Sequence, residues 1–501
     1  TSADSFIKIY TPTRSDEVGT NQRHSGVWST SYYRLAPTTG IPLTVSDEDV
    51  RIEGLQFYST DNDGVYINGA AGLSRIQFSQ NIIKGNATAS KRGLNLTATG
   101  ASSTAKILNN IIYDYSGAGS AGIYWNDADW TPYIYNNTIK DCAIGLDRAN
   151  DTAHYTKNNL IDATDAFNGT FTDNDTNNDY NAISENSADV AIGTNGRYNQ
   201  TFTYNDSTND NFHLGVGDAG ARNYGTDLSN DSYIPFNTDV DSACGRDAPP
   251  GRLYAGGDDQ CYTRPRGATW DIGADELITK IYRSVGPSED SVLATGASNH
   301  LNISGSTATF DTALSDSIGV GDALEYDDDN DDDIDASDSI AFISGRTSST
   351  VFTIKTATGG IPTAPSAADE IHWNINRAYT SLFNAEAGTE STLIDADLRA
   401  FDAGNRDIAA NSEQWNIACY ANGTTGDGGT TRTVMNGWTT YPTNYLRVYT
   451  PTSTTEVGTS QRHQGKWDSS KYWLEYTENY YYPALYIIEK YIRFDGLQVG
   501  L

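Results

Sequence analysis

Residues 109–114 of the chain read NNIIYD, and closely related stretches stand on either side of them. QNIIKG (80–85) comes before, and NNTIKD (136–141) and NNLIDA (158–163) come after. The second residue of each stretch is an asparagine: Asn81, Asn110, Asn137 and Asn159. The steps between these asparagines are 29, 27 and 22 residues. Such spacing indicates one structural unit that recurs along the chain.

The composition of these repeats is that of strands and turns. Thr, Tyr, Ile, Val, Asn and Gly dominate, and helical periodicity is almost absent. A repeat of roughly 20 to 30 residues with short strands and no helix is typical of one coil of a parallel β-helix. We therefore predict an all-β fold in which residues 1–184 form a right-handed parallel β-helix. The six-residue period of the left-handed form is not visible.

Stacked coils place equivalent residues in columns. The isoleucines that follow each asparagine should stack inside the β-helix: Ile83, Ile112, Ile139 and Ile161. The four asparagines should stack as a ladder at a bend, because their side-chain amides can bridge from coil to coil. Asparagine also tolerates the left-handed backbone of such a bend.

A longer repeat links the two ends of the chain. TPTRSDEVGTNQRHSGVWSTSYYRL (11–35) returns as TPTSTTEVGTSQRHQGKWDSSKYWL (450–474), 439 residues later. VRIEGLQF (50–57) returns as IRFDGLQV (492–499), 442 residues later. Glutamine, arginine, histidine, glycine and tryptophan recur in one register, which chance similarity does not explain.

The second copy predicts a second β-helix. We expect residues 440–501 to occupy the structural position of residues 1–62, one unit further along the axis. The leading coil then lacks a predecessor and the trailing coil lacks a successor, which leaves strand edges at both ends. Ile492 and Leu497 are the expected contacts between successive units.

The rest of the chain divides into three segments. They are an irregular closing segment (185–276), a small antiparallel β domain (277–376), and a capping helix with the first coils of the next β-helix (377–501). The helix is expected within AYTSLFNAEAG (378–388), with Thr380 or Ser381 as its N-cap.

Two runs in the closing segment carry a resemblance to a known family. FHLGVGDAGARNYG (212–225) and RPRGATWDIGADE (264–276) resemble the end of bacterial surface parallel β-helix proteins of the pectin-lyase-like superfamily. Those proteins commonly end with a His-Leu run, an Asp-Ala-Gly run and a final Asp-Ile-Gly-Ala-x-Glu. The resemblance implies the fold and says little about activity.

Charge and cysteine usage limit the partners and the setting. Asp and Glu number 65 against 33 Lys and Arg, a net charge of −32, which disfavours nucleic acid and anionic lipid as partners. No apolar run is long enough to insert into a membrane. Cys244 and Cys261 flank a loop that a disulfide could close, and both outcomes stay open. Cys142 and Cys419 fall in strand-like runs and are expected to be buried.

The run YDDDNDDDIDASD (326–338) is the strongest signal for an ion. Five aspartates match positions 1, 3, 5, 9 and 12 of a calcium loop of EF-hand type: Asp327, Asp329, Asp331, Asp335 and Asp338. Ile334 takes the hydrophobic position 8, but Asp332 replaces the turn glycine and Asp338 replaces the usual glutamate. The cofactor prediction is Ca²⁺, and the alternative is a solvated acidic loop.

The repeated Gln22-Arg23-His24 and Gln461-Arg462-His463 could suggest catalysis. Identical copies one structural period apart are typical of scaffold residues instead, so we predict no catalytic residue. The leading hypothesis is a structural repeat unit of an extracellular β-solenoid filament or giant cell-surface adhesin. It would assemble with itself head to tail, as tandem repeats or as a homopolymer, and surface polysaccharide is a further candidate partner. The alternative is a carbohydrate-active β-helix enzyme, a polysaccharide lyase or glycoside hydrolase.

Overall fold

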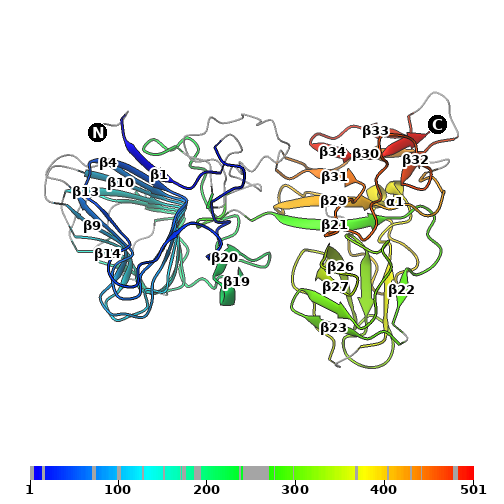
Figure 1. The fold of residues 1–501 in the computed structure, drawn as a ribbon, viewed down its shortest axis with the longest axis horizontal. Helices are drawn as coiled ribbons and strands as arrows, with labels where there is room; N and C mark the ends of the chain where they lie inside the picture. The colour runs from blue at the N-terminus through cyan, green and yellow to red at the C-terminus, as the bar shows by residue number, and fades with distance from the viewer. Residues whose placement is uncertain are drawn as a thin grey trace. The chain divides into compact units, whose positions relative to one another are not determined.

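The structure is a computed structural model of the 501-residue chain. It describes residues 5–13, 17–69, 75–98, 103–126, 129–149, 153–169, 171, 177–185, 193–235, 239–240, 270–275, 277–296, 298–366, 370–402, 406–428, 432–441, 443–477 and 483–500. The chain forms two compact units, Thr1–Leu277 and Ile278–Leu501 (Figure 1). Each unit is all-β and contains parallel sheets, as the sequence predicts.

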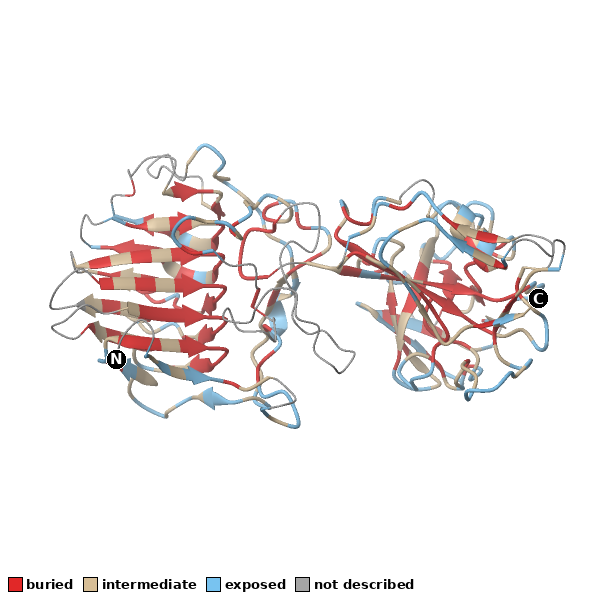
Figure 2. Ribbon diagram, turned by 90° about the horizontal axis from the view of Figure 1, so that it is seen from above, coloured by how far each residue is buried: buried red, intermediate tan, exposed pale blue. Residues whose placement is uncertain are grey.

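The first unit is a stack of coils built on two parallel sheets. The first sheet runs in the order β1 (Ile7–Tyr10), β4 (Asp49–Glu53), β7 (Arg75–Ser79), β10 (Ser103–Leu108), β13 (Trp130–Tyr135), β15 (Tyr155–Lys157) and β17 (Asn178–Asp179). Each strand pairs with the equivalent strand one repeat further along the chain. The chain therefore turns once per repeat and lays each coil on the one before it (Figure 2).

The second sheet of this unit has two arms that join in one long strand. Its order is β2 (Arg34–Leu35), β5 (Gln56–Tyr58), β8 (Ile82–Lys84), β11 (Ile111–Tyr113), β14 (Thr138–Arg148), β12 (Ala121–Trp125), β9 (Arg92–Ala98), β6 (Val65–Gly69) and β3 (Leu43–Val45). β14 pairs with β11 through its first residues and with β12 through its last. Strands β16 (Leu160–Asn168) and β18 (Ala182–Ile183) extend the stack from β14.

The expected isoleucine column is confirmed by register and burial. Ile83 pairs with Ile112, Ile112 with Ile139, and Ile139 with Ile161. All four side chains are fully buried in one apolar core. Because coils contact only their neighbours, this core exists only where several coils are stacked.

The structure also brings the four asparagines of the ladder together. Asn81 donates through its side chain to Asn110 Oδ1 at 3.1 Å, and Asn110 donates to Asn137 Oδ1 at 2.9 Å. Asn137 then donates to Asn159 Oδ1 at 3.0 Å, and Asn159 donates to Asn181 Oδ1 at 2.9 Å, a fourth step that adds a fifth asparagine. Each acceptor oxygen also receives the backbone N–H of the previous asparagine, so the column satisfies polar groups that are buried at the bend.

The described residues of the closing segment lie along the side of the stack. Arg197 pairs with Ala182 on the last coil, and the chain then runs back along the outer face. β19 (Tyr204–Asp206), the short 3₁₀ turn η1 (Ser207–Asn209) and β20 (Asn211–Leu214) belong to this return. Its Phe212 packs on Ile111, and its Trp270 packs on Tyr135. The segment therefore shields outward apolar residues of several coils.

The second unit combines a parallel and an antiparallel part. Its parallel sheet is β21 (Thr279–Val285), β29 (Glu413–Cys419), β31 (Leu446–Tyr449) and β34 (Ile492–Asp495), and two further parallel pairs are β30 (Thr433–Met435) with β33 (Leu485–Ile487) and β32 (Trp473–Glu475) with β35 (Gln498–Gly500). The antiparallel sheet is β22 (Ala294–Thr295), β28 (Trp373–Asn376), β25 (Ala323–Tyr326), β26 (Ser339–Arg346), β27 (Val351–Lys355), β24 (Thr307–Phe310) and β23 (Leu301–Ser304).

The antiparallel domain begins later in the structure than the predicted boundary at residue 277. β21 was expected in the antiparallel domain, but it pairs in parallel with β29 over seven residue pairs. The antiparallel sheet is thus an insertion that follows the first strand of the second stack. Helix α1 (Leu382–Ala387) comes after it; Ser381 caps its first turn by accepting from Asn384 N, and Gly388 ends it at φ 69°.

The asparagine column makes a stability prediction. We expect Asn110→Ala to lower the free energy of unfolding of the first unit by roughly 3 kcal/mol, because buried partners on both neighbouring coils lose their hydrogen bonds. The matched control is Asn230→Ala, which removes an exposed amide from the same unit and should cost less than about 0.5 kcal/mol. Urea unfolding curves of both variants measure the difference. Equal losses would show that the column contributes no special stability.

Candidate functional sites: the repeated coils, the acidic loop and a buried carboxylate

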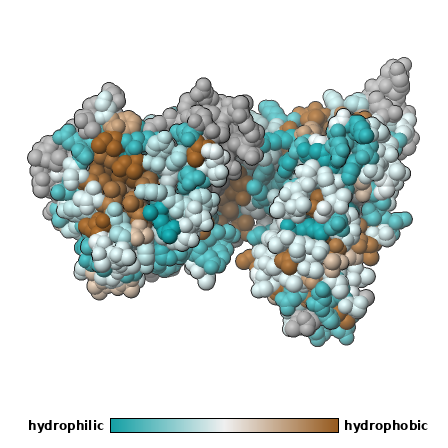
Figure 3. Space-filling model, viewed as in Figure 1, coloured by the Kyte–Doolittle hydropathy of each residue, from teal (hydrophilic) through white to brown (hydrophobic). Residues whose placement is uncertain are grey.

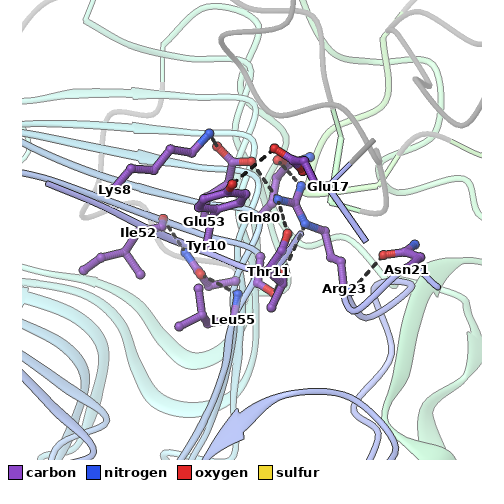
Figure 4. Close-up of polar contacts among 12 residues, drawn as sticks. Lys8, Tyr10, Thr11, Glu17, Asn21, Arg23, Ile52, Glu53, Leu55 and Gln80 are labelled. Atoms are coloured by element: carbon purple, nitrogen blue, oxygen red, sulfur yellow. Dashed lines mark hydrogen bonds and ion pairs between the residues drawn. The ribbon is translucent and has the colours of Figure 1, made fainter. Parts of the chain in front are cut away.

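The arginine of the first repeated motif joins three coils. Arg23 is buried, and its guanidinium donates to Thr11 Oγ1 at 3.3 Å, Glu53 Oε1 at 2.6 Å and Gln80 Oε1 at 3.0 Å (Figure 4). These partners follow β1, end β4 and follow β7, so they belong to three successive coils. Gly54 has φ 74°, and a Cβ there would lie 2.2 Å from Arg23 Nε, so only glycine fits over the guanidinium.

His24 has a structural role beside this arginine. Its Nδ1 accepts from Gly26 N at 3.1 Å, which leaves Nε2 as the donor to Gln80 O at 3.0 Å. The ring thus ties the loop before β2 to the third coil. Arginine and histidine therefore hold the first coils together in this structure.

The second copy repeats the arrangement without a third coil. Arg462 donates to Thr450 Oγ1 at 3.3 Å and pairs with Asp495 at 2.9 Å, beneath Gly496 at φ 77°. Its side chain is 30% exposed against 2% for Arg23. In the described part of the chain, no residue takes the place that Gln80 has beside Arg23.

The two copies differ in burial on the side of the preceding coil. On that side, residues of the first copy are exposed, whereas their equivalents in the second copy are buried. The exposed fractions are 42% for Ile7 against 0% for Leu446, 37% for Ile9 against 0% for Val448, and 53% for Tyr33 against 1% for Tyr472. The reason is that β29 pairs with β31, while β1 pairs only with β4 among the described strands. Apolar side chains gather on this face of the first unit (Figure 3).

On the other side of the same coils the difference is reversed. Phe57 is fully buried beneath β8, whereas its equivalent Val499 is 53% exposed. Ile492 and Leu497, the expected contacts between units, are half-buried and pack on the core of the second unit. The second copy therefore shows these coils with another coil stacked before them. The first copy shows the same coils with another coil stacked after them.

The acidic loop brings together three of the five aspartates predicted to bind an ion. Carboxylate oxygens of Asp327, Asp329 and Asp338 lie within 4.8 Å of one another. Asp331 and Asp335 fall outside this group; Asp331 is exposed and Asp335 is half-buried. Burial raises the pKa of Asp338, and the nearby Asp327 and Asp329 carboxylates raise it further. This group could hold a metal ion.

Backbone turns shape the acidic loop. Asp327 is buried and accepts from Asn330 N at 2.6 Å and from Asp332 N at 2.9 Å. Asp332 stands where a calcium loop has glycine, and it adopts φ 70°, so the loop makes the left-handed turn despite the substitution. Ile334 packs against the core of the second unit, as position 8 of such a loop would.

His372 is a neighbour that the sequence analysis missed. Asp327, Asp332 and His372 form a second group with ligand atoms within 4.8 Å of one another. Pairing of β25 with β28 brings His372 there, because Asp327 N donates to His372 O at 3.0 Å. No local pattern around His372 signals this contact.

A buried carboxylate was also missed. Asp427 Oδ2 accepts from Tyr472 OH at 2.5 Å and from Leu382 N, the first residue of α1, at 2.8 Å. Burial raises the pKa of Asp427 to about 6. Cys419 lies buried in the same unit as a free thiol whose pKa is raised by burial, and Cys142 is a buried free thiol in the first unit.

Two further expectations concern cysteines and membranes. Cys244 and Cys261 lie outside the described residues. Among the described residues, no helix combines the length and apolar character needed to cross a membrane.

Comparisons with known proteins leave the family open. No protein-family model matches the chain, and no curated protein and no solved structure matches it. The resemblance to the pectin-lyase-like superfamily therefore stays a prediction.

Asp427 makes a pH prediction. Its carboxyl has a folded pKa of about 6 against an ordinary value of 3.8, so the folded state holds a proton more tightly than the unfolded state between these values. The free energy of unfolding should thus fall as pH rises from about 4 to about 6, by about 3 kcal/mol, and level off above. Asp427→Asn removes this titration. We expect the stability difference between wild type and this variant to shrink over that window in urea titrations, and a difference independent of pH would contradict the assignment.

Proposed function

We propose that the chain is a structural repeat of an extracellular β-solenoid, a filament or giant cell-surface adhesin whose coils stack without a break from one repeat to the next. The observation that carries the proposal is the complementary burial of the two copies. Apolar residues that the first copy exposes are covered in the second by a preceding coil, and residues that the second exposes are covered in the first by a following coil.

The strand orders of the two units support this continuity. β31 (LRVY) is the equivalent of β1 (IKIY) in the repeat, and β34 (IRFD) is the equivalent of VRIE (50–53) in β4. Overlaying these pairs joins the two parallel sheets into one order: β21, β29, β1, β4, β7, β10, β13, β15 and β17. A repeat that ends on the coils with which it begins can continue indefinitely, because its contact is heterologous and does not close.

We infer that the coils form right-handed parallel β-helices. Crossovers between parallel strands of one sheet are right-handed in about 98% of cases. The partner is then the chain itself, through tandem repeats or a head-to-tail homopolymer. The high negative charge keeps such a surface soluble, and an extracellular setting and a surface polysaccharide ligand belong to the same proposal.

We also propose that the acidic loop binds Ca²⁺ through Asp327, Asp329 and Asp338. Three carboxylates in one place repel one another without a cation, and hard oxygen ligands suit Ca²⁺. The bound ion would stiffen the link between β25 and β26, which flank the loop.

Hydrogen exchange tests the continuity of the coils. We expect exchange of residues 485–500 to slow by about 100-fold or more when residues 60–501 are fused directly after Leu501, because the fused segment supplies the coil that follows β34 and β35. Mass spectrometry of the fusion and the original chain measures this change.

The matched control is the same fusion with Ile76→Asp and Phe78→Asp in the added copy. These residues pair with Val50 and Ile52 in the first unit, so their charged replacements should prevent the added coil from stacking. Unchanged exchange in the unsubstituted fusion would contradict the proposed function. Sustained turnover of a polysaccharide would instead support the carbohydrate-active alternative.

The calcium proposal predicts a chelator effect. EGTA should lower the melting temperature of the second unit, and Asp329→Asn with Asp338→Asn should abolish that response by removing two of the three grouped carboxylates. Asp331→Asn with Asp335→Asn is the control, since it removes the same charge from residues outside the group. Differential scanning calorimetry reads out both pairs. No EGTA response in the unsubstituted chain would leave only a solvated acidic loop, and equal EGTA responses of the two double variants would contradict the site at Asp327, Asp329 and Asp338.

A further inference from the structure

The second unit contains a coil that holds the repeated segment in place. We name β29, β30 and the intervening Asp427 the acceptor coil, and β1, β2 and β3 the start coil. In the second unit, Trp415 of the acceptor coil pairs with Leu446, and Ile417 pairs with Val448. Met435 pairs in the same way with Ile487 of β33.

The start coil carries the same kinds of residue at the same places. Ile7 and Ile9 replace Leu446 and Val448, and Val45 replaces Ile487. Both isoleucines lie in the interior columns of the first unit, because they pair with the buried Val50 and Ile52. Their exposed sides therefore face the position of a preceding coil.

A polar contact adds specificity to this apolar match. Asp427 Oδ2 accepts from Tyr472 OH at 2.5 Å, and Asp427 N donates to Trp473 O at 2.9 Å. The equivalent of Tyr472 in the start coil is Tyr33, which is 53% exposed. A buried carboxylate that accepts from a tyrosine hydroxyl selects tyrosine at this place, since any apolar replacement leaves the carboxylate short of a donor.

We propose that the acceptor coil of one chain binds the start coil of a second copy of the chain, in the place of its own residues 440–500. Trp415 would then lie beside Ile7 of the second copy, Ile417 beside Ile9, and Asp427 would accept from Tyr33. The inference rests on the proposed function and extends it from one chain to two. The start coil needs no rearrangement, because β4 already holds its other side.

Residues 440–500 are tethered to the acceptor coil by the same chain and compete with any second copy. A tethered segment has a high effective concentration, so it excludes the second copy unless its own contacts are weakened. The chain therefore carries its own blocking segment, and loss of that segment's contacts would start head-to-tail growth.

A mixing experiment with full-length chains tests the inference. The opened chain carries Leu446→Asp and Val448→Asp, which free the acceptor coil, and Ile7→Asp and Ile9→Asp, which prevent it from binding itself. We expect the opened chain and the wild-type chain to form a 1:1 complex in sedimentation equilibrium. A partner chain with Ile7→Asp and Ile9→Asp should bind at least about 100-fold more weakly. Tyr33→Phe in the partner should weaken the complex about 10-fold.

Two results would overturn the inference. One is the absence of a complex although hydrogen exchange shows residues 301–354 of the opened chain still folded; the other is equal binding of the wild-type and the Ile7→Asp, Ile9→Asp partners. If the opened chain fails to fold, Arg462→Ala with Asp495→Ala replaces the two substitutions in β31, because it loosens the blocking segment from outside the acceptor coil. The hydrogen-exchange test of the fused chain measures stacking within one chain. It can therefore give the expected result even when the mixing experiment shows no complex between two chains.

Discussion

Hydrogen bonding between successive coils is the constraint on which the rest of the structure depends. Each inner strand of the first sheet of the first unit pairs through backbone hydrogen bonds with the strands one repeat before and one repeat after it. A single coil buries too little apolar surface to be stable, so it exists only with neighbours. The asparagine column adds side-chain hydrogen bonds in the same direction and fixes where each coil bends. A strand that is paired on one side only, such as β1, therefore makes fewer of these hydrogen bonds than a strand paired on both sides.

Arg23 fixes the register of the first three coils relative to one another. A strand could slide on its neighbour by two residues and keep its apolar residues inside. A buried guanidinium that must meet Thr11, Glu53 and Gln80 at once permits only one alignment of three coils. Burying this charge is costly unless every partner is present, which makes misaligned coils unfavourable. In the second copy the same arginine stays partly exposed, and Asp495 in place of glutamate keeps the ion pair.

Local sequence was sufficient for the coils and insufficient for long-range pairing. The spacing of Asn81 and Asn110, together with Ile83 and Ile112, predicted the ladder and the interior column, because each repeat places the same residue at the same bend. β21 was misassigned because its partner β29 starts at Glu413, beyond the whole antiparallel insertion. The position of a residue within its repeat can be predicted from the sequence, whereas the pairing of a strand with a partner far along the chain cannot.

The candidate sites also divide into those that local sequence predicted and those that depend on distant contacts. The order of aspartates in residues 326–338 predicted the group around Asp327, and the left-handed turn at Asp332 formed without glycine. His372 and Asp427 were missed, since each reaches its site through strand or loop contacts from elsewhere in the chain. Asp427 is both a site that the sequence analysis missed and a contact of the repeated segment. It joins helix α1 to the repeated segment, and its tyrosine partner has an exposed equivalent in the first copy. The tyrosine that contacts Asp427 is therefore duplicated in the sequence, as Tyr472 and Tyr33, but only Tyr472 is buried.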